Sequence, residues 1–426
     1  MTTINLGLLG LGTVGSALVD LIEGNAALIT SKIGKQICVR KVLVRSADKP
    51  RKLPADRLTL NFDEILSDPS ISVVVELMGG IEPARAYVSS ALRSGKHVVT
   101  ANKDLISEYG QELFQLAAEH GAVLLFEGSV GGGIPVIRPL KQCLAGDHVI
   151  SIFGILNGTT NYILTKMTQD GMDYGEALSQ AQALGYAEAD PASDVRGLDA
   201  ARKLAILSSI AFNVRVKPGN VYTEGIERIS ARDILYAKEL GCVIKLTGIA
   251  RETADGVDVR VHPSLVPADH PLATVHNAMN ALFIKGAAVG ELMFYGPGAG
   301  GAATATAVLG DILEIADGTT SPMRLLSCTC FRHMDIRPVR LNVSRYYIRI
   351  LAKDKPGTLA KIAGILGKYG ISLRAVIQKA TINDMAEVVF VTHPATEQDL
   401  NQAMEEVSSH SRLFSSATII RFLDGT

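Results

Sequence analysis

The sequence contains no tryptophan, 5% aromatic residues and only five cysteines in 426 residues. The cysteines (Cys38, Cys143, Cys242, Cys328 and Cys330) are odd in number and mostly far apart, which argues against a disulfide framework. Only Cys328 and Cys330 are close, and no His or Cys cluster at zinc-like spacing accompanies them. We therefore expect five reduced thiols that serve as packing residues, and a reducing, cytoplasmic compartment.

An excess of charge of one sign is also missing, since 42 Lys and Arg balance 43 Asp and Glu for a net charge of -1. This balance predicts no basic surface for nucleic acid or anionic lipid. No apolar run approaches the roughly 18 residues of a membrane span. Met1–Asn5 lacks the cationic and apolar segments of a secretory signal. The 47% of hydrophobic residues instead indicates large buried cores in two to four domains.

Strand and helix patterns alternate between residues 4 and 127. Strands that are apolar throughout, separated by helices, are typical of a parallel sheet covered on both faces. We therefore predict an α/β fold with a Rossmann-type doubly wound parallel sheet. The predicted strands are Ile4–Leu9, Ile37–Val44, Ser72–Leu77, His97–Thr100 and Ala122–Phe126, and the predicted helices are Thr13–Ile29, Pro83–Ser94 and Leu105–His120.

The pattern changes after about Pro135. Residues 136–295 mix strands and helices, and we interpret them as an α+β domain for substrate binding, catalysis and dimerisation. The Arg-rich segment 331–345 shows no apolar period and is predicted to be a linker. Residues 346–426 follow a βαββαβ order, which is typical of a ferredoxin-like domain.

A glycine fingerprint, G-x-G-x-x-G, lies between the first strand and the first helix and comprises Gly10, Gly12, Thr13, Val14 and Gly15. The first glycine permits a tight turn, the second lets a pyrophosphate approach the backbone, and the third lets helix and strand pack closely. The helix N-terminus then presents free N–H groups to the phosphates. We assign residues 1–135, with a return segment at about 296–330, to an NAD(P)-binding domain.

The second strand ends on Arg45, and Lys49, Arg51 and Lys52 follow closely. A ribose 2′-hydroxyl is usually held at this point by Asp or Glu, and a 2′-phosphate by Arg. No acidic residue occupies the place, so Arg45 favours NADP, although NAD stays possible. The alternative interpretation is a solvated basic loop.

The stretch Leu198–Phe212 predicts a helix that is apolar nearly all round, yet it carries Asp199 and Lys203 four residues apart on one face. A surface ion pair is one interpretation. Because buried ions are costly, a polar cavity is the other. An acidic loop with Glu188 and Asp194 precedes this helix and suits a substrate ammonium group, unless it is simply solvated. Thr100 and Lys103 follow the fourth strand, at the sheet edge that faces a ligand crevice.

Together these segments resemble homoserine dehydrogenases over nearly the whole chain. The most specific parts are the sequences Asn-Gly-Thr-Thr-Asn-Tyr and Gly-Leu-Asp-Ala-Ala-Arg-Lys. The resemblance also includes the glycine fingerprint, Thr100–Lys103 and three further segments. The matched segments are 10–15, 100–103, 126–135, 157–162, 185–191, 197–203 and 298–301.

The resemblance implies reversible reduction of L-aspartate 4-semialdehyde to L-homoserine, on the route to threonine and methionine. It implies that Lys203 is the general acid/base and that Glu188 and Asp199 hold the substrate with support from Asp194. Lys103 would contact substrate or cofactor, and so count as catalytic with Lys203 and Asp199. Further cofactor contacts are implied for Thr100 and for Gly300, in the second glycine-rich loop.

The resemblance also implies a monovalent cation, commonly Na⁺. Its ligands would be the Glu127 carboxylate and the backbone carbonyls of Val130, Gly132 and Ile134. Neutral carbonyl oxygens suit a hard cation. A plain glycine-rich turn is the alternative.

Residues 353–359 and 371–373 resemble the ACT domain, a module that binds small amino acids between paired copies. We expect a homo-oligomer, a dimer or tetramer, in which residues 346–426 confer threonine feedback and are not needed for the chemistry. A dimerisation module without a ligand is the alternative. For the whole chain the competing functions are another NAD(P)-dependent reductase of amino-acid metabolism and a non-catalytic NADP or amino-acid sensor.

Overall fold

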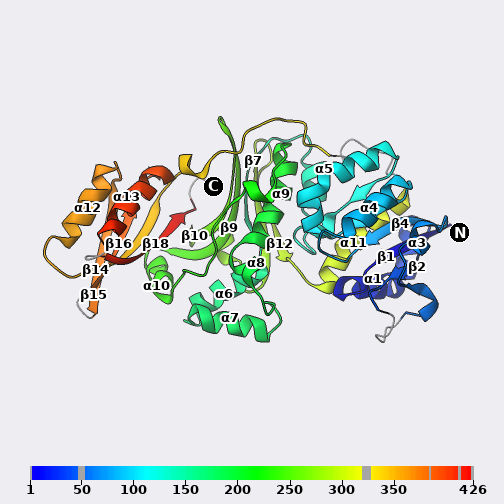
Figure 1. The fold of residues 1–426 in the computed structure, drawn as a ribbon, viewed down its shortest axis with the longest axis horizontal. Coiled ribbons are helices and arrows are strands. Elements are labelled where there is room, and N and C mark those ends of the chain that lie inside the picture. The colour runs from blue at the N-terminus through cyan, green and yellow to red at the C-terminus, as the bar shows by residue number, and fades with distance from the viewer. Residues whose placement is uncertain (1, 47–52, 319–327, 383–384, 411–413, 424–426) are drawn as a thin grey trace. The chain divides into compact units, whose positions relative to one another are not determined.

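The computed structural model describes residues 2–46, 53–318, 328–382, 385–410 and 414–423 (Figure 1). No helix in these ranges is long and apolar enough to cross a membrane. The chain divides into two compact units. Unit 1 comprises residues 1–152, 201–221 and 279–334, and unit 2 comprises residues 153–200, 222–278 and 335–426.

Unit 1 contains a six-stranded sheet in the order β3-β2-β1-β4-β5-β6. Every neighbouring pair is parallel, which confirms the predicted doubly wound class. In this order the chain reverses direction across the sheet between β1 and β4, the point where such folds bind ligands. The strands are β1 (Thr3–Leu9), β2 (Gln36–Leu43), β3 (Leu58–Thr59), β4 (Ile71–Glu76), β5 (His97–Thr100) and β6 (Leu124–Leu125).

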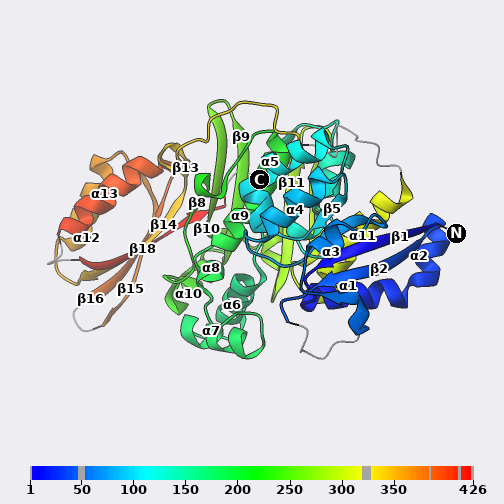
Figure 2. The same cartoon turned by 45° about the vertical axis from the view of Figure 1, so that its right-hand side comes forward.

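Helices cover both faces of this sheet (Figure 2). The apolar sides of α1, α2 and α11 share one core with the strands, and α4 and α5 lie on the other face. Four short elements, α3 (Asp63–Leu66), η1 (Ala55–Arg57), η2 (Glu127–Ser129) and the π-helical turn η3 (Pro139–Cys143), fill the connections. The covering helices are α1 (Thr13–Gly24), α2 (Ala26–Ile33), α4 (Ala84–Arg93), α5 (Lys103–Glu119) and α11 (Gly301–Asp317).

The prediction of one helix over residues 13–29 is wrong. The helix α1 ends at Gly24, and Asn25 has φ -110° and ψ 16° before α2 begins. Glycine and asparagine are both weak helix formers, so an apolar period that continues across them does not keep the helix intact. An antiparallel hairpin of β11 (Met279–Gly286) and β12 (Gly290–Pro297) was not predicted.

Unit 2 is built on a mixed sheet in the order β9-β10-β18-β14-β16-β15. Its last four strands and two helices confirm the predicted βαββαβ order of the closing segment, with one apolar core beneath α12 and α13. The elements are β14 (Tyr346–Lys353), α12 (Thr358–Lys368), β15 (Leu373–Ile382), β16 (Met385–Thr392), α13 (Glu397–Ser409) and β18 (Phe414–Phe422), beside β9 (Cys242–Thr253) and β10 (Gly256–Pro267).

Further elements of unit 2 precede the closing segment. They are α6 (Gly158–Gln169), α7 (Tyr174–Ala183), α8 (Ala192–Val195), α10 (Ala231–Glu239), the 3₁₀ turn η5 (Pro271–Thr274) and β8 (Tyr222–Thr223). The 3₁₀ turn η4 (Pro218–Asn220) belongs to unit 1. Two longer elements, β7 (Val149–Ile155) and α9 (Leu198–Phe212), contribute residues to both units.

The closing segment is joined to the rest of unit 2 by backbone pairing and by a buried ion pair. Strand β18 runs parallel to β10, with Ser264 opposite Arg421. Arg349 on β14 donates from Nε to the Asp233 carboxylate of α10 at 2.7 Å, and the Tyr347 hydroxyl donates to the same carboxylate at 3.0 Å. These residues therefore form one continuous structure with the preceding part of unit 2.

The segment predicted as a linker, residues 331–345, is held by specific hydrogen bonds. The Arg337 N–H donates to the Val257 carbonyl at 2.9 Å. After the turn η6 (Val339–Leu341), β13 (Val343–Ser344) pairs with β17 (Ala395–Thr396). An Arg-rich segment without an apolar period can thus be ordered by backbone pairing that its side chains do not reveal.

All five cysteines are free thiols, as predicted. The expectation that all of them are packing residues is wrong, because Cys143 and Cys328 are exposed and only Cys242 is buried. The odd count and wide spacing indicate the absence of disulfides, but they carry no information on exposure.

Candidate active site

The glycine fingerprint lies at the carboxyl end of β1, where two of its glycines are sterically required. A Cβ on Gly10 would lie 2.9 Å from the Leu77 carbonyl oxygen, and one on Gly15 would lie 2.5 Å from the Gly10 carbonyl oxygen. Gly10 also has φ +105°, which side chains rarely adopt. A Cβ on Gly12 would meet nothing within 4 Å. The open side of the turn is therefore at Gly12, the glycine that a pyrophosphate approaches.

A second helix begins beside the first. Gly300 is the N-cap of α11, with φ +119°, and a Cβ on Gly301 would lie 2.9 Å from the Thr13 side chain in the first turn of α1. Two helix N-termini with free N–H groups thus lie together at the point where the sheet order reverses. This arrangement suits an anionic ligand, and it brings together Gly12, Thr13 and Gly300 from distant parts of the sequence.

The loop after β4 is fixed by Glu76, a residue that the sequence analysis missed. Its buried carboxylate accepts hydrogen bonds from the Met78 N–H at 2.8 Å and the Thr100 hydroxyl at 2.6 Å. Burial raises the pKa of Glu76, and these hydrogen bonds oppose the rise. Asn102 caps α5 and donates to the Gly80 carbonyl at 2.6 Å. The Thr100 hydroxyl is thus used inside the protein, so any cofactor contact there falls to other atoms.

Arg45 follows the end of β2 and is exposed, as a residue at the rim of a nucleotide site would be. The other basic residues of the predicted loop, Lys49, Arg51 and Lys52, lie outside the described residues. The structure therefore places one cation, Arg45, near the strand end where ribose recognition is expected.

Helix α9 carries its charged pair in a buried position. The exposed fraction of Asp199 is 6% and that of Lys203 is 9%. Their spacing of four residues places both on one face of the helix. The interpretation as a surface pair is therefore wrong, while the polar cavity stays a prediction. Because charges cost free energy to bury, groups kept in this position indicate a polar site.

Four polar side chains of unit 2 meet at the start of α6. The Asn157 side-chain amide donates to the Asp194 carboxylate at 2.8 Å and to the Asp199 carboxylate at 2.9 Å. The Thr159 hydroxyl lies 3.1 Å from the second Asp194 oxygen. The side-chain oxygen of Asn157, Oδ1, caps α6 by accepting a hydrogen bond from the Thr160 N–H. One asparagine therefore holds together two of the three carboxylates that were predicted to bind the substrate.

Glu188 does not take part in this cluster of Asn157, Asp194 and Asp199. Its side chain is exposed, and its backbone carbonyl accepts from Gln182 Nε2 at 3.1 Å. The sequence analysis grouped Glu188 with Asp194 and Asp199 because all three are acidic and close in sequence. In the structure, Glu188 lies on an exposed loop, whereas the buried amide of Asn157 holds Asp194 and Asp199.

In unit 1, an ion pair connects the elements that carry the two predicted lysines. Arg202 Nε lies 3.0 Å from an Asp104 carboxylate oxygen. Arg202 precedes Lys203 on α9, and Asp104 follows Lys103 at the start of α5. Arg202 and Asp104 were not predicted as site residues, because a single charge next to a lysine in the sequence does not indicate which residue it pairs with.

The turn predicted to bind a cation uses the Glu127 carboxylate in a different way. That carboxylate accepts hydrogen bonds from the N–H groups of Val136 at 2.6 Å, Ile137 at 2.9 Å and Arg138 at 2.8 Å. The Glu127 N–H itself donates to Asp311 at 2.8 Å. Three backbone donors therefore take up most of the acceptor capacity of this carboxylate, and its role as a cation ligand stays a prediction.

The backbone carbonyls of the same turn are better suited than the Glu127 carboxylate to bind a cation. Val130, Gly132 and Ile134 are buried, and no hydrogen bond between described residues ends on their carbonyl oxygens. Gly132 has φ +56° and lies against Gly298, where a Cβ would be 2.6 Å from the backbone. Buried carbonyls without donors are the chemistry that a hard monovalent cation requires. Among described residues, no cluster of three His, Cys, Asp or Glu side chains offers another metal site.

Comparisons with known proteins agree along the chain. Three family models match: "Homoserine dehydrogenase, NAD binding domain" over residues 10–127, "Homoserine dehydrogenase" over residues 135–313 and "ACT domain" over residues 346–411. A homoserine dehydrogenase of Synechocystis sp. is 46% identical, with 99% of this chain and 100% of the relative covered.

Solved structures give the same result. A homoserine dehydrogenase from Thiobacillus denitrificans matches with a TM-score of 0.94 and 40% identity, covering 100% of this chain and 99% of that one. A hyperthermophilic archaeal homoserine dehydrogenase in complex with NADPH matches with a TM-score of 0.63 and 28% identity, covering 74% and 97% of the two chains.

Proposed function

Since this chain belongs to the homoserine dehydrogenase family of oxidoreductases, we propose that Lys203 is the general acid/base for interconversion of L-homoserine and L-aspartate 4-semialdehyde. The observation that carries the proposal is the buried position of Lys203, one helical turn after Asp199 on α9. Asp199 in turn belongs to the cluster held by Asn157. A nicotinamide cofactor supplies or accepts the hydride when bound.

The lysine acts on the oxygen atom of the reacting group. As the aldehyde is reduced, negative charge grows on its oxygen, and the Lys203 ammonium stabilises that charge and donates a proton to it. In the reverse direction, neutral Lys203 takes the proton from the homoserine hydroxyl. Asp199 lies one helical turn before the lysine on the same face of α9, where its carboxylate is placed to orient the ammonium group.

The cluster of Asn157, Asp194 and Asp199 is the proposed site for the substrate ammonium group. Two carboxylates that share one amide donor present a concentrated negative charge, which suits a cation. Glu188 reaches this cluster only if its exposed loop moves on substrate binding, so we assign it a secondary role. Lys103, next to the ion pair of Asp104 and Arg202, is proposed to meet the substrate carboxylate or the cofactor.

NADP is the proposed cofactor, with Gly10, Gly12, Thr13, Val14, Gly15 and Gly300 around its pyrophosphate and Arg45 at its 2′-phosphate. We assign this role to residues 1–135 and 296–330, and substrate binding to residues 136–295. A monovalent cation, Na⁺, is proposed at the carbonyls of Val130, Gly132 and Ile134. The proposal also includes a homo-oligomer, threonine binding by residues 346–426 and a cytoplasmic location.

A steady-state assay of homoserine-dependent nicotinamide reduction tests the reaction and the cofactor together. The purified full chain is supplied with L-homoserine and either NADP⁺ or NAD⁺, and kcat/KM is measured for each. The proposal predicts turnover with both and a higher value for NADP⁺. No turnover with either cofactor would reject the reaction, and a higher value for NAD⁺ would reject the assignment of Arg45.

A further inference from the structure

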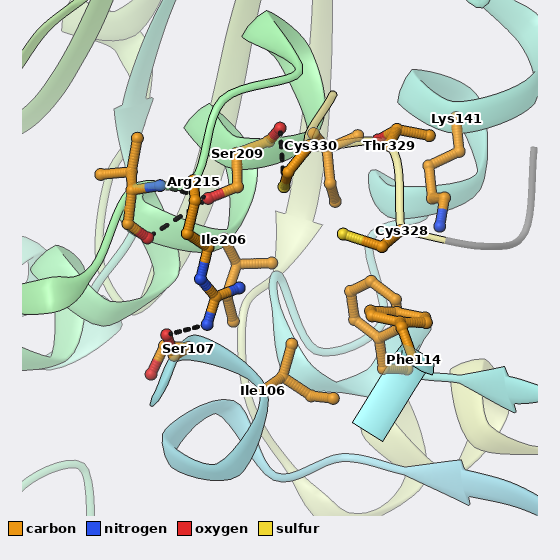
Figure 3. Close-up of a pocket in the computed structure, with 13 residues that line it drawn as sticks. Ile106, Ser107, Phe114, Lys141, Ile206, Ser209, Arg215, Cys328, Thr329 and Cys330 are labelled. Atoms are coloured by element: carbon orange, nitrogen blue, oxygen red, sulfur yellow. Dashed lines mark hydrogen bonds between the residues drawn. The ribbon is translucent and has the colours of Figure 1, made fainter. Parts of the chain in front are cut away.

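A small cavity in unit 1 brings a pair of thiols together with two cationic side chains (Figure 3). Its walls include Cys328, Cys330, Lys141 and Arg215, and the rest is mainly apolar. The cavity volume is ≈ 30 Å³, which is room for about two water molecules. The space therefore suits a reagent of the size of peroxide and excludes an organic ligand the size of a substrate or effector.

Both thiols line this cavity. Interaction with the Cys330 thiol and with the Cys330 backbone N–H lowers the pKa of Cys328. The same contact raises the pKa of Cys330. The Cys330 sulfur also lies 3.9 Å from the Ser209 carbonyl on α9, which fixes its position. Cys328 is exposed, so a reagent in solution can reach it.

Both cations favour the thiolate form of Cys328. Arg215 donates from Nη2 to the Ser107 carbonyl at 2.9 Å, and its Nε is buried without a hydrogen-bond partner among the described residues. Lys141 is buried and lies over the rings of Phe114 at 5.0 Å and Phe126 at 5.5 Å. An anionic sulfur, or an oxygen attached to it, would satisfy the donor that Arg215 leaves open.

We propose that Cys328 and Cys330 form a redox-active dithiol that reacts with hydroperoxides. The Cys328 thiolate attacks one oxygen of the hydroperoxide and the O–O bond breaks. The attacked oxygen stays on sulfur, so that Cys328 becomes a sulfenic acid, and the other oxygen leaves and takes a proton to form an alcohol or water. The Cys330 thiol then attacks the Cys328 sulfur, the S–OH bond breaks, and water and a Cys328–Cys330 disulfide form. Each cycle oxidises two thiols and reduces one peroxide bond, and a dithiol reductant restores both thiols.

A metal site at the same residues is disfavoured by the surroundings. Two cationic side chains repel a metal ion, and within the described ranges no third His, Cys, Asp or Glu completes a ligand group. Thiolates beside cations in partly exposed positions are instead typical of reactive cysteines.

The first test oxidises the intact protein with one equivalent of hydrogen peroxide, followed by alkylation and peptide mapping. We expect the peptide with Cys328 and Cys330 to lose two hydrogens, to resist alkylation and to recover both thiols with dithiothreitol. In Cys330→Ser, dimedone should trap the sulfenic acid on Cys328. Intact thiols at both positions, with oxidation first at Cys38, Cys143 or Cys242, would overturn the proposal.

The second test compares the iodoacetamide alkylation rates of Cys328 and Cys143, another exposed thiol of the same chain. Because the thiolate reacts, we expect Cys328 to react roughly tenfold faster at about pH 6, with an advantage that disappears as pH rises. Lys141→Met, which keeps an apolar stem against Phe114, should slow Cys328 several-fold and leave Cys143 unchanged. Equal rates and equal pH profiles for the two thiols would contradict the proposal.

Discussion

Asn157 shows how one side chain determines the charge distribution of the site. Its amide donates to Asp194 and Asp199, while its carbonyl oxygen caps α6. Without the amide, two carboxylates would face each other with no shared donor. Their mutual repulsion would then favour protonation of one of them or displacement of a side chain.

Replacing Asn157 by serine separates these two roles, because serine also caps helices but cannot donate to both carboxylates. We expect kcat/KM for homoserine to fall by about 10- to 100-fold, the range for lost hydrogen bonds to charged groups. The KM for the cofactor should stay unchanged. A value of kcat/KM for homoserine within twofold of the wild type would show that the amide does not organise the site.

Arg45→Asp tests the cofactor preference at the end of β2. The change replaces a cation by a carboxylate of the kind that binds a ribose 2′-hydroxyl, so NADP should weaken and NAD should gain in relative terms. The measured quantity is the ratio of kcat/KM for the two cofactors. Lys32→Asp, at an exposed cation on α2, is the matched control. Equal ratios for Arg45→Asp and the control would place 2′-phosphate recognition elsewhere.

The sequence predicted which charged residues are important better than it predicted which residues they contact. Asp199 and Lys203 could be predicted because two charges on an otherwise apolar helix need an explanation. Asn157 and Glu76 were missed as organisers because their contacts lie 37 and 24 residues away in sequence. The three backbone hydrogen bonds to the Glu127 carboxylate were missed as well, because residue type alone does not show which backbone groups a carboxylate accepts.

At the scale of elements, the glycine fingerprint divides into structural and ligand-facing positions. A Cβ on Gly15 would collide with the Gly10 carbonyl oxygen, whereas a Cβ on Gly12 would enter open space. The pattern of alternating strands and helices predicted this turn correctly. The break between α1 and α2, and the hairpin of β11 and β12, depend on local chemistry and on non-local pairing that an apolar period does not encode.

The variants Gly12→Ala and Gly15→Ala should therefore behave differently. Gly15→Ala is expected to lower the free energy of unfolding by about 1–3 kcal/mol through overpacking. Gly12→Ala should leave the melting temperature nearly unchanged but raise the KM for the cofactor, since the new methyl group lies where the pyrophosphate approaches. The checks are thermal unfolding and cofactor titration of both variants. Equal cofactor KM values for Gly12→Ala and wild type would exclude that side of the turn as the phosphate site.

The ion pair of Asp233 and Arg349 fixes the closing segment to α10. Burial acts to raise the pKa of Asp233, but hydrogen bonds from Arg349 and Ser230 outweigh it, so the pKa lies below its ordinary value. In the unfolded chain the carboxylate protonates first as pH falls. The contribution of Asp233 to stability is therefore present above about pH 4 and is lost as pH falls through the folded-state pKa.

Asp233→Asn should lower the free energy of unfolding by about 3 kcal/mol at neutral pH, because it leaves the Arg349 charge without its partner. The difference from wild type should narrow below about pH 4, where the carboxylate of the unfolded wild-type chain begins to protonate. Urea unfolding across this pH range checks both statements. Asp255→Asn, at an exposed turn, serves as control. If Asp233→Asn lowers the free energy of unfolding by the same amount at every pH, the electrostatic explanation is rejected.

At the scale of the whole molecule, the closing segment is more closely attached than its sequence indicates. Its removal after about residue 335 would unpair the edge of β10 and leave Asp233 buried without Arg349. A truncated chain would therefore be destabilised for reasons unrelated to threonine. Single substitutions that preserve these contacts therefore test the proposed threonine regulation better than a truncation does.

The central claim is that Lys203 performs proton transfer, and the turnover number of Lys203→Ala tests it most directly. The account predicts a kcat about 100- to 10,000-fold below wild type for homoserine oxidation, with unchanged cofactor affinity and melting temperature. Lys166→Ala, at a lysine paired with Asp170, should keep full activity. A Lys203→Ala enzyme that retains more than half of the wild-type kcat would contradict the account and make Lys103 the first candidate in its place.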